Sequence, residues 1–135
     1  DLVVSEADYA KWAEEQKKLL AAQADDPNKE WTGPELIARG EKVYAANCVA
    51  CHQGSGKGVV GAFPALDGSK IVMGPKAENI QILLKGKPGT AMQSFAAQLN
   101  DVEIAAVITY TRAAWANAGK GQDPVVAPAD IKAAR

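Results

Sequence analysis

Both cysteines and the single histidine of this 135-residue chain lie within five consecutive residues, Cys48-Val49-Ala50-Cys51-His52. C-x-x-C-H is the attachment signature of c-type haem. The two thiols are spaced to reach the two vinyl groups on one side of a porphyrin, and the next imidazole can bind the iron as its proximal ligand. The chain is therefore expected to fold around one covalent haem c, attached through Cys48 and Cys51 and ligated by His52.

Three other uses of this motif fit the sequence less well. A thioredoxin-type dithiol needs a βαβ setting, and no strand pattern is visible. A structural zinc site needs four Cys or His ligands, and the chain has three. A Cys48–Cys51 disulfide would close a very small loop with little entropic return. Aromatic residues are only 6% of the chain, so a buried porphyrin would also supply a large apolar body to the core.

One histidine cannot supply both axial ligands, so the sixth position falls to methionine, to another side chain, or to nothing. Met73 and Met92 follow His52 by 21 and 40 residues, and both lie in predicted loops. Met92 is favoured because it lies between the helix-breaking sequence Gly-Lys-Pro-Gly at 86–89 and the last predicted helix. A loop in that place can cover the face of the porphyrin opposite His52. Met73 leads into a helix and is interpreted as packing. A thioether ligand raises the potential, which suits electron transfer rather than oxygen chemistry.

Helical periodicity and capping signals predict an all-α fold with long loops. Helices are expected over 5–24, about 32–46, 77–85 and 100–117. The glycine-rich stretch 53–76 is predicted to be a loop, and loops of that length in compact domains usually bind something. No strand pattern or internal repeat stands out.

Charge and composition divide the chain into three parts. Residues 1–30 sum to −4 and the other 105 residues to +3, although the whole chain is only −1. We expect an N-terminal connecting helix and linker over 1–30, a main domain over 31–117, and an extended Ala-, Gly- and Pro-rich tail over 118–135. The first helix carries one apolar stripe, which packs either on its own domain or on a partner; the stripe comprises Tyr9, Trp12, Ala13, Leu19 and Leu20.

Several functional classes are disfavoured by composition. A net charge of −1 argues against a sequence-independent nucleic-acid binder. Mean hydropathy is −0.15, and no apolar run approaches the ~20 residues that a membrane span needs. The chain starts at Asp1 without a signal-peptide pattern, so we interpret it as a processed protein or an excised piece.

Over about residues 33–117 the sequence resembles the class I cytochromes c. The matching elements are the C-x-x-C-H motif, the 58–66 segment, Met92 and the two long helices. In that family the first and last helices cross through a glycine and aromatic residues, which match Gly40, Tyr44 and Tyr110. Glycine there allows close backbone approach.

The resemblance also implies roles for individual residues. The carbonyl of Pro64 would orient the imidazole of His52, Phe63 and Tyr44 would line the haem pocket, and Met92 would be the second axial ligand. Gln93 departs from the family pattern, in which proline often follows the methionine. This departure could loosen the ligand loop without removing the ligand.

A closer resemblance is to the cytochrome c domain fused behind the copper domain of bacterial cytochrome c oxidase subunit II, carried by residues 3–12, 61–69 and 128–132. It implies electron input from a cytochrome or a quinol-oxidising complex and output to the copper centre. It also implies a periplasmic position or the outer face of the inner membrane, with anchoring through a missing N-terminal part. The domain alone would be a monomer and not an enzyme. A stand-alone periplasmic shuttle, and a haem enzyme or gas sensor with an open distal site, are the alternatives.

Lysines outnumber acidic residues in the middle of the chain. Between residues 53 and 99 there are five lysines and two acidic residues. A basic rim near the haem edge would steer an acidic partner at low salt. The same residues could equally form an ordinary solvated face.

Overall fold

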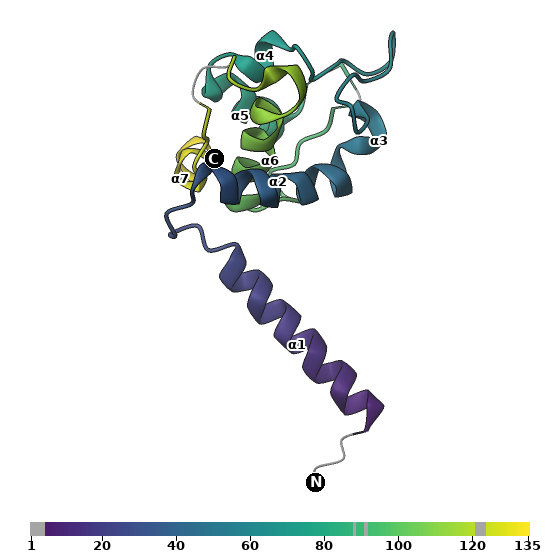
Figure 1. Cartoon of the computed structure of the whole chain (residues 1–135), viewed down its shortest axis with the longest axis vertical. Helices are drawn as coiled ribbons and strands as arrows, with labels where there is room; N and C mark the ends of the chain where they lie inside the picture. The colour runs from purple at the N-terminus through teal and green to yellow at the C-terminus, as the bar shows by residue number, and fades with distance from the viewer. Residues whose placement is uncertain (1–4, 88, 91, 121–123) are drawn as a thin grey trace.

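A computed structural model describes residues 5–87, 89–90, 92–120 and 124–135 of the protein. Within these residues the chain is helical, and an isolated bridge between Val59 and Phe63 is the only β pairing. The all-α prediction is confirmed. None of the described helices is long and apolar enough to cross a bilayer. The elements, shown in Figure 1, are α1 (Glu6–Ala24), α2 (Gly33–Asn47), α3 (Val49–His52), α4 (Lys70–Met73), α5 (Lys76–Lys85), α6 (Asp101–Ala113), a 3₁₀ turn (Trp115–Asn117) and α7 (Pro128–Ala134).

Reciprocal capping fixes where the two long domain helices begin. The Thr32 hydroxyl accepts from the Glu35 amide at 3.3 Å, and the Glu35 carboxylate accepts from the Thr32 amide at 3.1 Å. Asn100 and Glu103 make the same pair of bonds at 2.7 and 3.0 Å. Each of these capping boxes gives hydrogen-bond partners to backbone amides at the start of a helix, which have no carbonyl partner within the helix. Local sequence alone therefore sets the starts of α2 and α6.

The core forms where α2 crosses α6. A Cβ added at Gly40 would lie 2.1 Å from the Ala106 carbonyl oxygen and 2.6 Å from the Tyr110 Cβ. The two backbones therefore approach as closely as a glycine allows, which is the crossing that the resemblance implies. Buried apolar side chains from α2, α5, α6 and the C-terminal segment fill the space around it, among them Leu36, Val43, Leu83, Ile104, Ile108, Val126 and Ile131.

The prediction of an extended tail over 118–135 is wrong for its last part. Residues 128–134 form α7, which opens at Pro128 and buries Ile131 completely. The Asp130 carboxylate accepts from the Ala127 amide at 2.9 Å, so the Pro-Ala-Asp sequence is a helix start. The buried Thr109 hydroxyl accepts from the Val126 amide at 3.0 Å and ties the tail to α6.

Two other predicted boundaries are also wrong. Helix α6 ends at Ala113 rather than near 117, because Ala114 is extended and Trp115 turns to a positive φ of 52°. The indole N–H of Trp115 donates to the Gly54 carbonyl at 3.0 Å, so a tertiary contact overrides helical periodicity. The predicted loop over 53–76 contains the short helix α4, which Ser69 caps by accepting from the Val72 amide.

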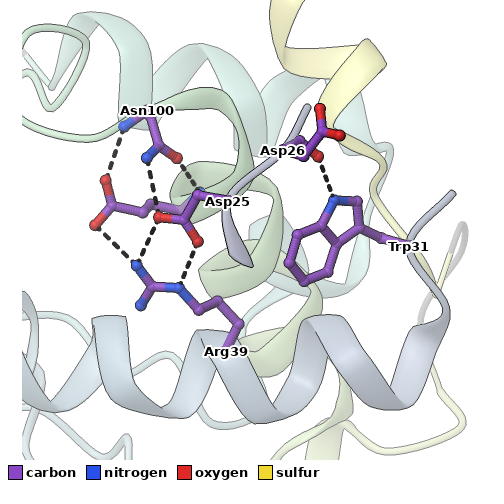
Figure 2. A network of polar contacts seen from close by, with 6 residues as sticks. Asp25, Asp26, Trp31, Arg39 and Asn100 are labelled. Atoms are coloured by element: carbon purple, nitrogen blue, oxygen red, sulfur yellow. Dashed lines mark hydrogen bonds and ion pairs between the residues drawn. The ribbon is translucent and has the colours of Figure 1, made fainter. Parts of the chain in front are cut away.

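The linker after α1 is held to the domain by a polar network (Figure 2). Arg39 donates twice to the Asp25 carboxylate, at 2.8 and 2.9 Å, and Asn100 donates to the same carboxylate at 3.1 Å. The Arg39 guanidinium also lies 3.5 Å from Glu103. Hydrogen bonding to Arg39 lowers the pKa of Asp25 below its ordinary value. The residue that follows α1 is therefore attached to the middle of α2 and to the start of α6.

Beyond this attachment α1 extends away from the domain (Figure 1). Tyr9 and Trp12 remain 61% and 56% exposed, and their rings contact each other at 6.1 Å. The part of the predicted apolar stripe that Tyr9 and Trp12 form therefore remains largely exposed. The side chains of Leu19 and Leu20 lie outside the part of the chain that the structure describes.

The Arg39–Asp25 contact predicts a pH-dependent contribution to stability. Because the folded pKa of Asp25 is depressed, the contact stabilises the fold above the ordinary pKa of 3.8 and is lost as the pH falls through the folded value. Asp25→Asn should lower the free energy of unfolding by about 1 kcal/mol at pH 7, and the difference from wild type should shrink below about pH 4. Urea unfolding at a series of pH values measures it. Asp26→Asn, in the same linker, is the control, and a pH-independent difference for Asp25→Asn would contradict the assignment.

Candidate haem site

One apolar cavity of about 290 Å³ brings together the residues singled out from the sequence. Its walls come from the end of α2, from α3, from the loop after it, from α4 and α5, from the segment that follows α5, and from α6. Met73 does not line it among the described residues; it is half-buried on α4. The predicted cofactor residues around the cavity are Tyr44, Cys48, Cys51, His52, Phe63, Pro64 and Met92.

The imidazole of His52 has a fixed orientation. Its Nδ1 lies 2.9 Å from the Pro64 carbonyl oxygen. A carbonyl can only accept, so Nδ1 carries the proton and donates, and Nε2 keeps the lone pair that a metal needs. The His52 carbonyl in turn accepts from the Gly58 amide at 3.0 Å. The loop therefore selects the tautomer that binds iron through Nε2.

The two cysteines lie half-buried at the junction of α2 and the single turn of α3. The amides of Cys51 and His52 both donate to the Cys48 carbonyl, at 3.3 and 2.9 Å, which holds the motif in one compact turn. Burial, with a smaller contribution from Cys51, raises the pKa of the Cys48 thiol to about 11. A thiol of that kind is a weak nucleophile at neutral pH, which disfavours dithiol redox chemistry. No group of three or more His, Cys, Asp or Glu side chains arranged to hold a metal ion is found among the described residues.

Met92 is placed by a segment that folds back on the end of α5. Its carbonyl accepts from the Lys87 amide at 3.0 Å, and its amide donates to the Thr90 hydroxyl at 3.2 Å. Gly86 ends α5 with a φ of +72°, and a Cβ there would lie 2.7 Å from the Met92 carbonyl oxygen. The Ser94 hydroxyl then ties the end of this segment to α5 by donating to the Leu84 carbonyl at 2.5 Å. Gln93 lies within this braced segment, although it replaces the family's proline.

These residues fit a haem c. The cavity offers two thiols, one imidazole with a free Nε2 and one thioether, which are the four groups that bind haem c and its iron in a His/Met cytochrome. The rest of the lining is mostly apolar, as a flat aromatic macrocycle requires.

The sequence matches, over residues 35–110, the family described as cytochrome c oxidase, cbb3-type, subunit III. That match covers more than half of the chain. The chain belongs to this cytochrome c family. Domains of this kind bind one haem c covalently, and they transfer electrons rather than act as enzymes in themselves.

The relatives of this cytochrome c domain are matched over very different shares of their own length. Cytochrome c-552 of Thermus thermophilus is 41% identical over 97 residues, which cover 62% of this chain and 72% of that protein. Subunit CcoP of the cbb3-type oxidase of Azospirillum brasilense is 32% identical over 89 residues, 62% of this chain and 30% of that subunit. The cytochrome c subunit of the quinone-dependent alcohol dehydrogenase of Gluconobacter oxydans is 29% identical over 106 residues, 71% of this chain and 22% of that subunit.

The long loop of this cytochrome c domain is held by side chains that sequence reasoning missed. The amide of Asn117, which is fully buried, donates to the Leu66 carbonyl at 2.9 Å and accepts from the Gly68 amide at 2.8 Å. Arg112 donates to the Val72 and Gly74 carbonyls at 2.8 and 2.7 Å. Such bonds satisfy loop backbone groups that lack a helix or sheet partner. The available signal was Arg112 itself, which is the one charged residue of α6 after its first turn.

Proposed function

We propose that this domain carries one electron at a time on a haem c bonded to Cys48 and Cys51, with His52 and Met92 as axial ligands. The observation that carries the proposal is the convergence of the C-x-x-C-H turn and Met92 on one apolar cavity, with His52 Nε2 left available by the Pro64 contact. The bound haem supplies the redox-active iron. The chain holds both ligands on hydrogen-bonded segments, so little rearrangement accompanies a change of charge.

Maturation in a bacterial host competent for haem attachment tests this proposal. The purified protein should be coloured, should keep its haem after denaturation and acid-acetone extraction, and should gain the mass of one haem with no titratable thiol. A Cys48→Ala/Cys51→Ala variant is the matched control and should release any haem on extraction. A colourless wild-type product with two free thiols would refute the proposal.

More specifically, we propose delivery of electrons to the copper centre of an oxidase subunit II, on the outer face of the bacterial inner membrane. Helix α1 would be the connector that lies against the copper domain. Its exposed Tyr9 and Trp12, its attachment at Asp25 and the resemblance over 3–12 support this role. A Tyr9→Ser/Trp12→Ser variant should slow electron transfer to a copper domain supplied in solution, while leaving the haem spectrum unchanged. Equal rates would argue against the connector role.

A stand-alone periplasmic shuttle is the second candidate. The match to cytochrome c-552 across 72% of that protein favours it. The upstream reading frame in the source genome separates the two: copper ligands and membrane helices indicate the oxidase, and a signal peptide alone indicates the shuttle.

One lysine in the cavity lining and one in the adjoining surface hollow predict salt-dependent electron transfer. Lys87 lines the cavity and Lys57 lines the adjoining surface hollow, whereas Lys76 is paired with Asp130 at 3.2 Å. The rate with an acidic partner should fall several-fold as ionic strength rises from about 10 mM to about 150 mM, because the Debye length shortens from ~30 to ~8 Å. A Lys57→Gln/Lys87→Gln variant should flatten this dependence in stopped-flow measurements, and Lys132→Gln on α7 should not. A wild-type electron-transfer rate that rises or stays constant as ionic strength increases would contradict electrostatic steering by these lysines.

A further inference from the structure

Arg135 holds the turn that connects the Met92 segment to α6. Its guanidinium donates to the carbonyls of Ala96 and Leu99 at 2.6 and 2.9 Å, and to the Asp101 carboxylate at 2.6 Å. A guanidinium is planar and carries five N–H donors, so one side chain can serve two carbonyls and a carboxylate at once. The residue that directly follows α7 therefore fixes a stretch of chain more than thirty residues away in the sequence.

The turn that Arg135 holds also carries part of the cavity wall. The Leu99 amide donates to the Phe95 carbonyl at 3.0 Å, which closes a turn over residues 95–99. Phe95 is 6% exposed and lines the cavity. Only three residues separate Phe95 from Met92, a reach of about 10 Å at most. A displacement of the 95–99 turn is therefore passed on to Met92.

The contacts on the other side of this stretch are neutral hydrogen bonds to α5. The Phe95 amide donates to the Leu83 carbonyl at 2.8 Å, and the Ser94 hydroxyl donates to the Leu84 carbonyl. Hydrogen bonds from a charged donor are roughly twice as strong as neutral ones. The contacts of Arg135 are thus the stronger attachment of the 95–99 turn, and they come from the side opposite to the α5 bonds in the chain order.

We propose that Arg135 is a positioning residue for Met92. By bracing the 95–99 turn it slows the opening of the 92–99 stretch, and so limits replacement of the methionine by another ligand. This inference rests on the proposed function, because it takes Met92 to be an axial ligand. The role differs from general stabilisation, since it acts on one segment and on ligand exchange there.

Helix α7 keeps its place without the Arg135 side chain. Ile131 is fully buried, and the Asp130 carboxylate pairs with Lys76 of α5 at 3.2 Å. The Thr109 hydroxyl of α6 accepts from the Val126 amide just before the helix. A substitution at Arg135 therefore releases the 95–99 turn while α7 remains packed on the core.

The rate of methionine replacement in the ferric holoprotein tests the role. Added imidazole can take the position of the methionine only after the segment opens, so the limiting binding rate at high imidazole concentration reports the opening rate. Arg135→Gln should raise this rate about tenfold, because charge-assisted bonds to two carbonyls are lost. Arg135→Lys keeps the charge beside Asp101 but lacks the planar fork, and should still raise the rate about threefold. A wild-type rate in Arg135→Lys would mean that the charge alone suffices, and would contradict the carbonyl contacts as the brace.

Two control variants separate positioning from loss of charge and loss of stability. Lys132→Gln removes a positive charge from an exposed position on α7 and should leave the opening rate unchanged. Thr32→Ala removes a cap at the start of α2, which lowers global stability without touching the 92–99 stretch. If Thr32→Ala accelerated imidazole binding as much as Arg135→Gln does at an equal loss of stability in urea, the positioning role would be refuted.

Hydrogen exchange locates the effect within the holoprotein. The amides of Phe95 and Leu99 should exchange faster in Arg135→Gln than in wild type, whereas the capped amide of Glu35 should not. Equal opening rates and equal exchange in the two proteins would overturn the inference. A wild-type protein that lacks haem, or that lacks the sulfur-to-iron band, would instead refute the proposed function, and that result is visible before any Arg135 variant is made.

Discussion

Replacing Met92 by alanine should abolish the sulfur-to-iron absorption band of the ferric protein and lower its midpoint potential by more than about 100 mV, because axial ligands set haem potentials over ~0.8 V. In the alanine variant the carbonyl of residue 92 can still accept from the Lys87 amide and its amide can still donate to the Thr90 hydroxyl, so only the thioether is lost. The sixth position then opens, and the ferric iron should become high-spin or bind water and small exogenous ligands. Visible spectra and spectroelectrochemical titration measure both effects.

Met73→Ala is the matched control for this experiment. Met73 is half-buried on α4 and does not line the cavity among the described residues, so its loss should cost about 1 kcal/mol of stability and leave the absorption band intact. If Met73→Ala removed the band instead, the ligand assignment would pass to Met73. A wild-type protein that is already high-spin and binds added ligands would show that neither methionine ligates, and would favour the open-site alternative.

The parts of the site that sequence could predict are those encoded in short local patterns. The C-x-x-C-H motif occupies one turn, and the capping boxes at Thr32 and Asn100 satisfy amides within three residues of themselves. The sequence also favoured Met92 over Met73, and the structure places Met92 but not Met73 in the cavity lining among the described residues, while its role as an iron ligand stays a prediction. Each of these predictions needs only the chemistry of neighbouring residues.

The parts that sequence could not predict depend on contacts between distant segments. Trp115 leaves the helical conformation because its indole donates to Gly54, 61 residues away. Asn117 holds the 66–68 segment across about 50 residues. The helix start at Pro128 is encoded locally, by a proline in the first turn and an aspartate two residues later. It was not predicted because the Ala-, Gly- and Pro-rich composition of the tail indicated an extended chain.

Gly40→Ala should destabilise the holoprotein by about 2–4 kcal/mol, although the same change in an exposed helix stabilises by about 1 kcal/mol. The added Cβ would meet the Ala106 carbonyl oxygen at 2.1 Å, so α2 and α6 must separate. Urea unfolding followed by circular dichroism measures the loss. Gly33→Ala, on the same helix, meets only the Val125 side chain at 3.3 Å and should stay within about 1 kcal/mol of wild type.

The identity of the obstructing atom at Gly40 sharpens this prediction. A clash with a side chain could be relieved by truncating that side chain, but the nearest atom to the new Cβ is a backbone oxygen. Gly40→Ala/Ala106→Gly should therefore recover no stability relative to the single variant, and should lose about 1 kcal/mol more because of the new glycine in α6. Recovery of stability in the double variant would mean that the helices cross at a greater distance than the Gly40 contact implies. Since Tyr44, Cys48 and the cavity wall on α6 are positioned by this crossing, the single variant should also weaken the sulfur-to-iron absorption band before global unfolding begins.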